Sequence, residues 1–453
     1  MKALPLLSIV AIVLSGCSVS RLPKPGGPVM GQTPVVLSDD GGWCWFESPR
    51  AIIHGRKLLI GSVASGSNDP ARKGDIDLIV HDLKTGQTST VELHDRLQLD
   101  DHDCPAILSR PDGRLLATFA KHNNENLRYY RISQPNDPLH WGPEQTFIPS
   151  NATRVTYSNL FQLPAENGRI YDFYRGLDNS FKPSYSYSDD QGQTWMKGSV
   201  VIRVPSTQRH RPYVCYASNG IDTIHMLYTE AHPRDYDNNL YHVYYQAGML
   251  HKSDGTPICS LAEGLESPDE GTRIFKADPD HVAWCANIVL DSSQRPVAVY
   301  SVQIGSAGLP QGQGGDDIRY RYARWDGKAW QDHALAYAGT RLYAGEDDYS
   351  GLATIEPDDP NIVYISTNSD PETGSPLISS ADGKRHYELF RGETQNIGAS
   401  WSWAPITRNS TLDNLRPIRP PADGRDRVLL WLRGTYRAYT DYQQQVMAIF
   451  WKN

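Results

Sequence analysis

The chain has 453 residues, a formal net charge of -8 at pH 7, 37 glycines and 31 prolines. The acidic balance argues against nucleic acid as the main partner, although a local cluster of Arg and His can still bind an anionic substrate in one cleft. The sequence contains 11 Trp and 25 Tyr, many short alternating apolar runs and few long amphipathic helical patterns. This profile indicates an all-β protein rich in turns.

The N-terminal segment has the pattern of a secretory signal. Met1-Lys2 precedes an apolar run, Ala3–Leu14, that is too short to remain as a membrane-spanning helix. Leu14-Ser15-Gly16-Cys17 resembles the lipobox of bacterial lipoproteins, in which the cysteine is lipidated and becomes the mature N-terminus. An ordinary cleaved signal with a chance cysteine is the alternative. We expect a lipid anchor at Cys17.

Three segments follow from this interpretation. Residues 1–17 are the expected signal peptide, and residues 18–38, which contain several Pro and Gly, are the expected flexible tether. Ser18 directly after the cysteine suggests, by resemblance to lipoproteins, sorting to the outer membrane. Residues 39–453 are the expected folded domain, which we expect to be monomeric.

One stretch of the chain predicts a β-hairpin with histidines at both ends. Ala106-Ile107-Leu108 and Leu115–Ala120 are short apolar runs, and Pro111-Asp112-Gly113 between them is a tight-turn sequence. A hairpin brings its two outer ends to the same edge of a sheet. His102 and His122 should therefore lie close together, where they can act as an acid/base pair.

Hairpins of this kind recur along the whole chain. The seven units are Trp45–Ser62, His102–His122, Tyr157–Arg175, Arg211–His232, Ala283–Gln303, Tyr349–Thr367 and Asn414–Arg433. Each is followed by further strand-like sequence, and four-stranded sheets repeated around an axis form a β-propeller. We therefore predict a seven-bladed β-propeller, with Val446–Trp451 closing the ring against the first blade.

One outer hairpin carries a motif that is specific for propeller blades. Ser188-Asp189-Asp190-Gln191-Gly192-Gln193-Thr194-Trp195 matches the Asp-box pattern S-x-D-x-G-x-T-W, in which Asp and Gly shape a turn and Trp packs between strands. Ser380-Ala381-Asp382-Gly383 is a degenerate echo of it. The motif is structural and does not indicate a reaction.

The ends of three successive hairpins collect residues that can move protons or bind a carboxylate. Equivalent inner strands place these ends around one mouth of the central channel. The residues are His102, His122, Tyr157, Arg175, Arg211, Tyr213 and His232. His and Tyr are proton-transfer groups, and Arg or charged His pairs with carboxylates. The alternative is that each is an ordinary polar residue at a solvated strand end.

These residues and their neighbours resemble a known enzyme family. The motifs are Asp100-Asp101-His102-Asp103-Cys104-Pro105-Ala106, Lys121-His122-Asn123, Thr156-Tyr157-Ser158-Asn159, Phe173-Tyr174-Arg175-Gly176, Arg211-Pro212-Tyr213, His232-Pro233-Arg234 and Asn239-Leu240-Tyr241-His242. They look like the propeller-type ulvan lyases of polysaccharide lyase families 24 and 25, with the lipobox-bearing chain closer to family 25. The resemblance runs from about Asp39 to the C-terminus. It implies a seven-bladed propeller that cleaves the linkage between sulfated rhamnose and uronic acid in ulvan by β-elimination.

The resemblance also implies roles for individual residues. His102 and Tyr157 match the acid/base positions, and their order stays open because it depends on whether the uronate is glucuronic or iduronic acid. His122 and Arg175 match the positions that neutralise the uronate carboxylate. No cofactor is implied for catalysis.

Metal binding is a separate expectation. The resemblance implies metal ions away from the chemistry, which makes Cys215, His232 and Cys285 the candidate ligands of a structural zinc ion, with calcium as the other candidate metal. Their spacing matches no recognised zinc pattern. Buried, unligated cysteines are the alternative, and the absence of any CxxC pair gives little support for a disulfide framework.

Two other functions fit parts of the sequence. A sialidase-like glycoside hydrolase would share the Asp box and would need an arginine triad, for which Arg175, Arg211 and Arg416 are the candidates, but no convincing Tyr–Glu nucleophile pair accompanies them. A non-catalytic glycan-binding propeller lipoprotein is the other alternative. The expected partners are ulvan and, through the lipid anchor, the membrane.

Overall fold

The computed structural model describes residues 32–149, 154–177, 181–203, 207, 209–305, 309–422 and 424–452. The expected signal peptide, Cys17 and the first part of the tether lie outside these ranges. Among the described residues, none of the helices has the length and apolar character needed to cross a membrane.

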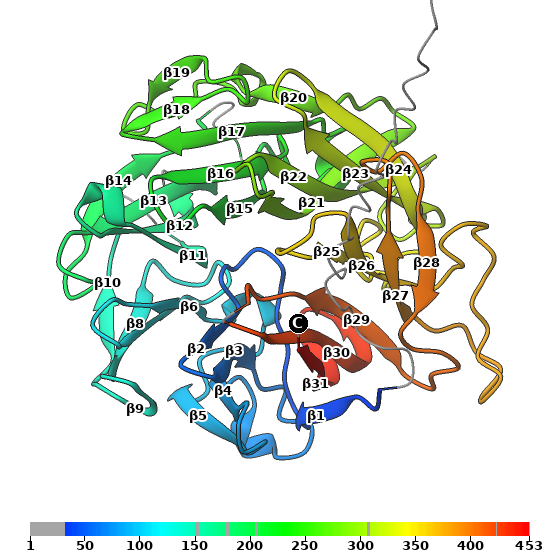
Figure 1. Ribbon diagram of the computed structural model, residues 1–453, viewed down its shortest axis with the longest axis horizontal. Helices are drawn as coiled ribbons and strands as arrows, with labels where there is room; N and C mark the ends of the chain where they lie inside the picture. Colours follow the sequence, from blue (N-terminus) through cyan, green and yellow to red (C-terminus); the bar gives the residue numbers. More distant parts are fainter. Residues whose placement is uncertain are drawn as a thin grey trace, which may run out of the picture.

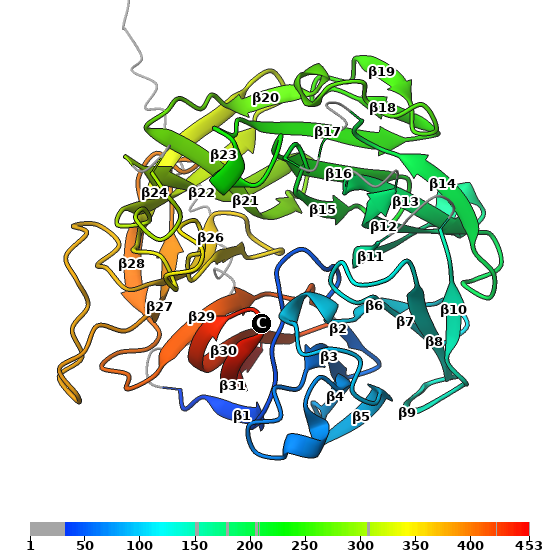
Figure 2. The ribbon, with the colours of Figure 1, turned by 180° about the vertical axis from the view of Figure 1, so that it is seen from behind.

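Seven antiparallel sheets are arranged around a central axis (Figures 1 and 2). The first sheet contains β2 (Ala51–His54), β3 (Lys57–Val63), β4 (Ile76–Asp82) and β5 (Thr88–His94). The second contains β6 (Ala106–Ser109), β7 (Leu115–Phe119), β8 (Arg128–Gln134), β9 (Asp137–Trp141) and β10 (Gln145–Phe147). The third contains β11 (Thr156–Leu163), β12 (Arg169–Leu177), β13 (Lys182–Ser188) and β14 (Met196–Val200). The fourth contains β15 (Val214–Ser218), β16 (Thr223–Tyr228), β17 (Leu240–Gln246), β18 (Met249–His251), β19 (Pro257–Ser260) and β20 (Thr272–Phe275).

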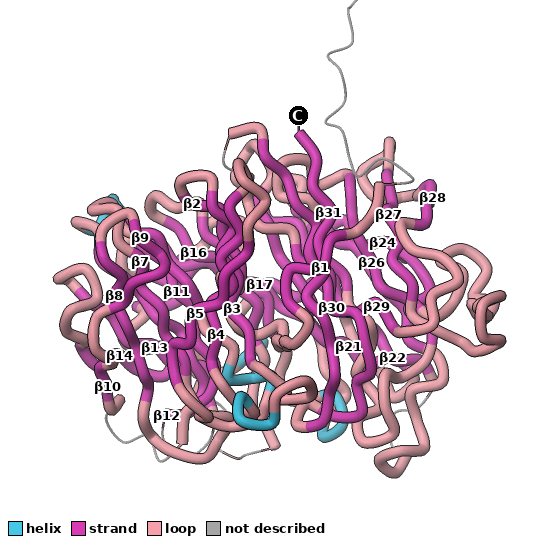
Figure 3. Tube along the Cα trace, turned by 90° about the horizontal axis from the view of Figure 1, so that it is seen from below, coloured by secondary structure: helices cyan, strands magenta, loops and turns pink. Residues whose placement is uncertain are grey.

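The remaining sheets complete the ring. The fifth sheet contains β21 (His281–Leu290), β22 (Pro296–Ile304), β23 (Ile318–Trp325) and β24 (Trp330–Gly339). The sixth contains β25 (Ala353–Ile355), β26 (Ile362–Thr367), β27 (Glu388–Glu393) and β28 (Ser402–Pro405). The seventh contains β29 (Asp413–Ile418), β30 (Asp426–Ala438), β31 (Asp441–Lys452) and β1 (Val35–Ser38). Short 3-10 turns are η1 (Pro70–Arg72), η2 (Asp101–Asp103), η3 (Pro164–Glu166), η4 (Pro233–Asp235) and η5 (Pro268–Glu270). Figure 3, which views the disc from its side, shows several of these turns at one face.

The predicted seven-bladed β-propeller is confirmed. Each of the seven hairpins expected from the sequence forms the first two strands of one sheet, from β2–β3 to β29–β30. The closure differs from the prediction. The last strand, β31, pairs with β30 and with the N-terminal strand β1, where Val35 lies opposite Ala448. The C-terminal part of the chain supplies only three strands of the last blade, β29, β30 and β31. The N-terminal strand β1 is the fourth strand of that blade, and its pairing with β31 closes the ring.

The centre of the ring is filled by a segment between β1 and β2. Trp43, Cys44, Trp45 and Phe46 are all buried. The Trp45 ring lies edge-on to two rings from distant blades, at 5.1 Å from both Trp284 and Tyr349. This aromatic plug leaves the functional residues around it at one end of the channel.

The predicted Asp box is confirmed as the turn between β13 and β14. The Ser188 hydroxyl accepts the Gly192 N–H at 2.8 Å, and Asp190 accepts the Thr194 N–H at 2.8 Å. Trp195 then packs into the apolar cluster between the second and third blades.

A second turn has the same hydrogen-bond pattern and was not recognised in the sequence. It spans residues 394–401, between β27 and β28. Thr394 accepts the Gly398 N–H at 3.0 Å, Asn396 accepts the Ser400 N–H at 2.9 Å, and Trp401 follows. Asn replaces the usual Asp, which hid the motif, because an amide oxygen accepts the same backbone bond as a carboxylate.

Candidate active site

His102 is held by a 3-10 turn directly before β6. Asp100 caps this turn, since its carboxylate accepts the His102 backbone N–H at 3.0 Å. The sequence predicted a strand end here. The short turn η2 instead directs the histidine into the channel, where only 4% of it is exposed.

The two predicted histidines lie together and share one carboxylate. His102 Nδ1 is 2.6 Å from Asp100 Oδ1, and His122 Nδ1 is 2.8 Å from Asp100 Oδ2. The two imidazole rings are stacked, with centroids 4.1 Å apart and planes inclined by 17°. The hairpin β6–β7 therefore brings its ends together as expected.

The two rings differ in charge. Burial alone would lower the pKa of His102, but the ionised Asp100 carboxylate beside Nδ1 outweighs burial and holds that pKa well above its ordinary value. For His122, burial and the neighbouring His102 charge lower the pKa to about 4. The two histidines hold the pKa of Asp100 well below its usual range, although burial opposes them. Near neutral pH the cluster is thus an imidazolium, a carboxylate and a neutral imidazole.

Tyr157 comes from the start of β11, on the next blade. Its ring centroid is 5.7 Å from that of His102, and its backbone has a φ of 68° where the register between β11 and β12 shifts. The hydroxyl is buried and has no hydrogen-bond partner among the described residues. Burial holds the pKa of Tyr157 well above its ordinary value, so the side chain is a neutral phenol aimed at no protein group.

Arg175 lies near the end of β12, between two tyrosine rings. Its guanidinium carbon is 4.8 Å from the Tyr157 ring centroid and 4.9 Å from that of Tyr213. Arg175 is 3% exposed, and its Nε and Nη1 have no hydrogen-bond partner among the described residues. Two donors of a buried cation are therefore left for another group.

The third hairpin extends this arc of side chains. The Tyr213 ring is 6.5 Å from Tyr157 and 5.5 Å from His232. Arg211 Nη2 is 3.6 Å from Asp235 Oδ2, and His232 Nε2 is 3.7 Å from Glu346 Oε2. All seven residues predicted from the hairpin ends thus lie along one continuous arc.

The arc is closely packed. A cavity of about 20 Å³ lies beside Tyr157, Arg175 and Tyr213, while larger cavities, two of them of about 640 and 620 Å³, lie elsewhere. This small cavity holds little more than a water molecule. A larger ligand would contact the site from the channel mouth, where His122 and Arg211 are partly exposed.

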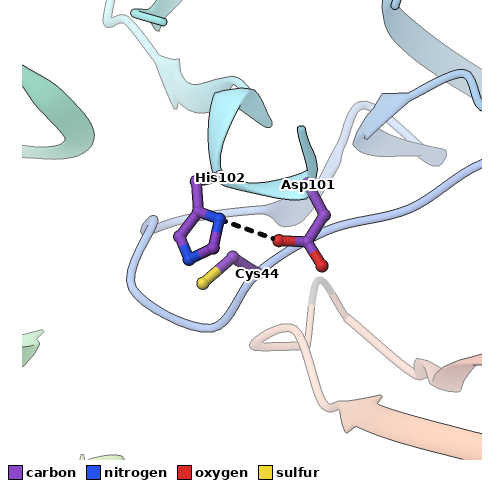
Figure 4. Close-up of side chains that lie close together, drawn as sticks. All are labelled: Cys44, Asp101 and His102. Carbon is purple, nitrogen blue, oxygen red and sulfur yellow. Dashed lines mark ion pairs between the residues drawn. The ribbon is translucent and has the colours of Figure 1, made fainter. Parts of the chain in front are cut away.

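Two residues beside His102 were not predicted to belong to the site. These are Cys44 and Asp101, which lie together with His102 (Figure 4). Asp101 Oδ1 is 3.1 Å from His102 Nδ1. Burial raises the pKa of the fully buried Cys44 thiol, which disfavours a thiolate nucleophile. Cys44 lies in the plug, and a loop crossing the channel is not visible in strand periodicity.

Arg416, a candidate for a sialidase-type triad, is engaged elsewhere. Its Nη1 is 2.6 Å from Asp101 Oδ2, and its Nη2 donates to the Tyr436 hydroxyl at 2.7 Å. Arg416 is buried and bonded to the same Asp101 that faces His102. It therefore supports the carboxylates around the histidine and does not join Arg175 and Arg211 as a free triad.

The candidate zinc ligands are not gathered into a compact donor set in the described residues. Cys285 lies beside Cys215, with its Sγ 3.5 Å from the Tyr213 carbonyl oxygen. His232 instead accepts the Arg234 N–H through Nδ1 and faces Glu346. Two compact donor groups occur in the described chain, Cys44/Asp101/His102 and Asp100/His102/His122, and neither includes the predicted ligands.

The fold is shared with solved propeller structures. One is described as a new family of polysaccharide lyase, PL25 ulvan lyase, bound to -[GlcA(1-4)Rha3S]-; it is 15% identical, with 91% of this chain and 95% of that chain covered and a TM-score of 0.67. Another, polysaccharide lyase Uly1, is 9% identical, with 92% and 98% covered and a TM-score of 0.57. At these identities the likeness shows the seven-bladed fold.

Comparison at the sequence level gives the family. No curated protein sequence matches the chain significantly. The family model described as BNR repeat-containing family member matches residues 71–338, which is more than half of the chain and includes three of its blades in full and nearly all of a fourth. The chain therefore belongs to the BNR repeat-containing family.

Proposed function

We propose that the protein is a polysaccharide lyase that cleaves uronic acid-containing polysaccharides by β-elimination, with ulvan as its substrate. The observation that carries the proposal is the convergence, on one arc, of a charged histidine, an unpartnered tyrosine hydroxyl and a guanidinium with two unpartnered nitrogens. These groups supply proton transfer and carboxylate neutralisation, the two requirements of the reaction.

The first requirement is neutralisation of the uronate carboxylate. Its negative charge increases when the C5 proton is removed, so cationic donors stabilise the transition state. Nε and Nη1 of Arg175 can form a charge-assisted pair with a carboxylate. His122, which shares the cluster, is placed to support this interaction by taking up a proton.

The second requirement is transfer of two protons. A base removes the C5 proton, the C4–O4 bond breaks, a C4–C5 double bond forms, and an acid protonates O4. The charged resting form of His102 favours the donor role, which leaves proton acceptance to Tyr157. For this role Tyr157 first releases its hydroxyl proton to solvent, and the Arg175 cation stabilises the phenolate that then takes the C5 proton.

The choice of polysaccharide draws on two supports. The residues of the arc resemble those of propeller-type ulvan lyases, and one solved structure of the same fold is described as an ulvan lyase bound to -[GlcA(1-4)Rha3S]-. We propose the linkage between rhamnose 3-sulfate and the uronate as the bond that is cleaved, with an unsaturated uronate at the new non-reducing end.

The test is digestion of a panel of uronic polysaccharides by the purified domain. A lyase produces ultraviolet absorbance from the new double bond, whereas a hydrolase produces reducing ends without that absorbance. His102→Ala should abolish the signal on ulvan. New reducing ends without absorbance would support a hydrolase, and binding of ulvan without cleavage would support a non-catalytic glycan-binding protein; both results contradict the proposal.

We also propose that the mature protein is anchored to the cell envelope through a lipid on Cys17. The support is the lipobox-like sequence Leu14-Ser15-Gly16-Cys17. Cys17→Ala should move the protein from the membrane fraction to the soluble fraction. Retention in the membrane fraction would exclude the lipid as the anchor.

A further inference from the structure

One carboxylate serves both histidines of the active site. Asp100 is 1% exposed, and its two oxygens are divided between the rings: Oδ1 lies 2.6 Å from His102 Nδ1, and Oδ2 lies 2.8 Å from His122 Nδ1. Oδ1 also accepts the His102 backbone N–H at 3.0 Å. The side chain is thus bound from three directions, and each contact involves a histidine.

These contacts determine where the imidazole protons lie. An ionised carboxylate can only accept hydrogen bonds, so each Nδ1 facing Asp100 must carry hydrogen. A neutral imidazole carries hydrogen on only one nitrogen. In His122, Nε2, on the far side of the ring from the carboxylate, is therefore an acceptor and is free to take up a proton. In charged His102, Nε2 carries the proton that can be transferred.

We propose that Asp100 is a positioning residue, which fixes hydrogen on Nδ1 of both His102 and His122 and so makes Nε2 the reacting nitrogen of each ring. The expected effect of Asp100 on catalysis rests on the proposed lyase function. The arrangement of protons on the two histidines does not, because it can be observed without substrate.

The surroundings hold Asp100 and both rings in place. Tyr439 packs edge-on against the two imidazoles, at 5.2 Å and 85° from His102 and 5.5 Å and 78° from His122. The backbone N–H of Asp101 donates to the Tyr439 carbonyl at 3.0 Å, which ties the turn to the last blade. Neither ring can turn over without losing its bond from Nδ1 to Asp100.

The informative substitution is Asp100→Asn. Asn also caps helical turns well, so the turn η2 should form normally. Its amide offers one oxygen in place of two, and its nitrogen is a donor. Only one of the two histidines can then keep a bond from Nδ1–H, and the other is forced towards the opposite tautomer.

Asp103→Asn is the matched control. Asp103 belongs to the same turn, is fully buried and forms no hydrogen bond with either imidazole among the described residues. Burial and nearby Asp100 hold its pKa well above the ordinary value, so it is already uncharged near neutral pH. This control introduces the same chemical change without touching an imidazole nitrogen.

The experiment combines nitrogen-15 NMR of labelled histidines with steady-state kinetics. In the unsubstituted protein, Nδ1 of both His102 and His122 should be protonated, with assignments made from His102→Ala and His122→Ala. In Asp100→Asn, at least one Nδ1 should lose its proton, and kcat on ulvan should fall about 10²–10⁴-fold with a smaller change in KM. Asp103→Asn should retain both tautomers and kcat.

Two results would overturn the proposal. One is an unprotonated Nδ1 in either ring of the unsubstituted protein. The other is an Asp100→Asn variant that keeps both tautomers and full kcat. If no uronic polysaccharide is cleaved at all, the proposed function fails, but the NMR measurement still decides whether Asp100 fixes the two rings.

Discussion

The two halves of the candidate active site are built in opposite ways. In the histidine half, Nδ1 of both His102 and His122 is bonded to Asp100, and Asp101 is bonded to Arg416. In the tyrosine–arginine half, the Tyr157 hydroxyl and two nitrogens of Arg175 have no partner among the described residues. In the first half Nδ1 of each histidine is bonded without a ligand, whereas in the second half buried donors stay unpaired until a ligand supplies acceptors.

This difference has an energetic meaning. A buried polar group without a hydrogen bond costs about 1–3 kcal/mol of stability, and more when it is charged. Such a cost is typical of sites where stability is exchanged for function. The histidine half therefore fixes geometry and protonation in advance, while the tyrosine–arginine half provides binding energy that is released when a substrate carboxylate arrives.

The largest expected effect comes from removing a proton-transfer group from either half. His102→Ala and Tyr157→Phe should each lower kcat on ulvan about 10²–10⁴-fold, because each deletes a group that gives or takes a proton. The measurement is steady-state formation of unsaturated product by purified, folded variants.

Matched controls separate chemistry from packing. Tyr130→Phe removes a hydroxyl that bonds the Gln193 carbonyl at 3.1 Å on the outer part of a blade, and His140→Ala removes an exposed imidazole. Both should retain kcat. Near-normal kcat in His102→Ala and in Tyr157→Phe would exclude these assignments and direct attention to Arg211, Tyr213 and His232.

Arg175 should separate binding from turnover. Arg175→Ala should raise KM as well as lower kcat, because the guanidinium can pair with the uronate carboxylate in both the ground state and the transition state. Arg175→Lys should restore only part of the activity, since an ammonium group cannot reproduce the planar pair of donors. Full restoration by Lys would show that charge alone is needed and that the unpaired Nε and Nη1 have no specific role.

The sequence predicted one half of the site better than the other. Hairpin ends are visible as apolar runs separated by turn residues, so His102, His122, Tyr157 and Arg175 could be placed at one channel mouth. Cys44, Asp101 and Arg416 could not be placed there. Cys44 lies in the loop that fills the channel, and the contact between Asp101 and Arg416 joins positions 315 residues apart. Residues 394–401 were missed because Asn replaces Asp in an otherwise regular turn.

A third test concerns Glu47, a carboxylate in the central plug. Both of its oxygens are buried without a hydrogen-bond partner among the described residues, and burial raises its pKa to about 8. The folded protein holds this proton while the unfolded chain releases it above about pH 4.5, so stability is lost as pH rises from about 4.5 to 8.

Glu47→Gln should therefore raise the free energy of unfolding at pH 8 by an amount on the order of 1 kcal/mol and weaken its pH dependence. Denaturant unfolding at pH 5 and pH 8 measures both effects. Glu92→Gln, at an exposed position of β5, is the control and should change neither. A loss of stability at pH 8 would mean that the Glu47 carboxylate is ionised and paired in the folded protein.

The smallest expected effect is a change in the protonation of His122 when a substrate binds to both halves of the site. His122 is neutral in the free protein because burial and the His102 charge lower its pKa to about 4. The Asp100 carboxylate opposes this shift, whereas the Arg175 charge adds to it. Tyr439, the remaining neighbour, packs on the ring of His122. A bound uronate carboxylate adds a negative charge beside the ring and raises this pKa.

Binding should therefore take up as much as one proton, and affinity should strengthen a few-fold as pH falls from about 7 towards 5. Titration calorimetry of the slowly turning Tyr157→Phe variant with a uronic oligosaccharide, in buffers of different ionisation enthalpy, measures the proton uptake. His122→Gln keeps a polar side chain but cannot be protonated, so it should abolish the uptake while His140→Ala should not. Equal proton uptake by the unsubstituted site and by His122→Gln would show that another group takes up the proton. The two histidines would then keep the same charge, as well as the same geometry, when the ligand binds.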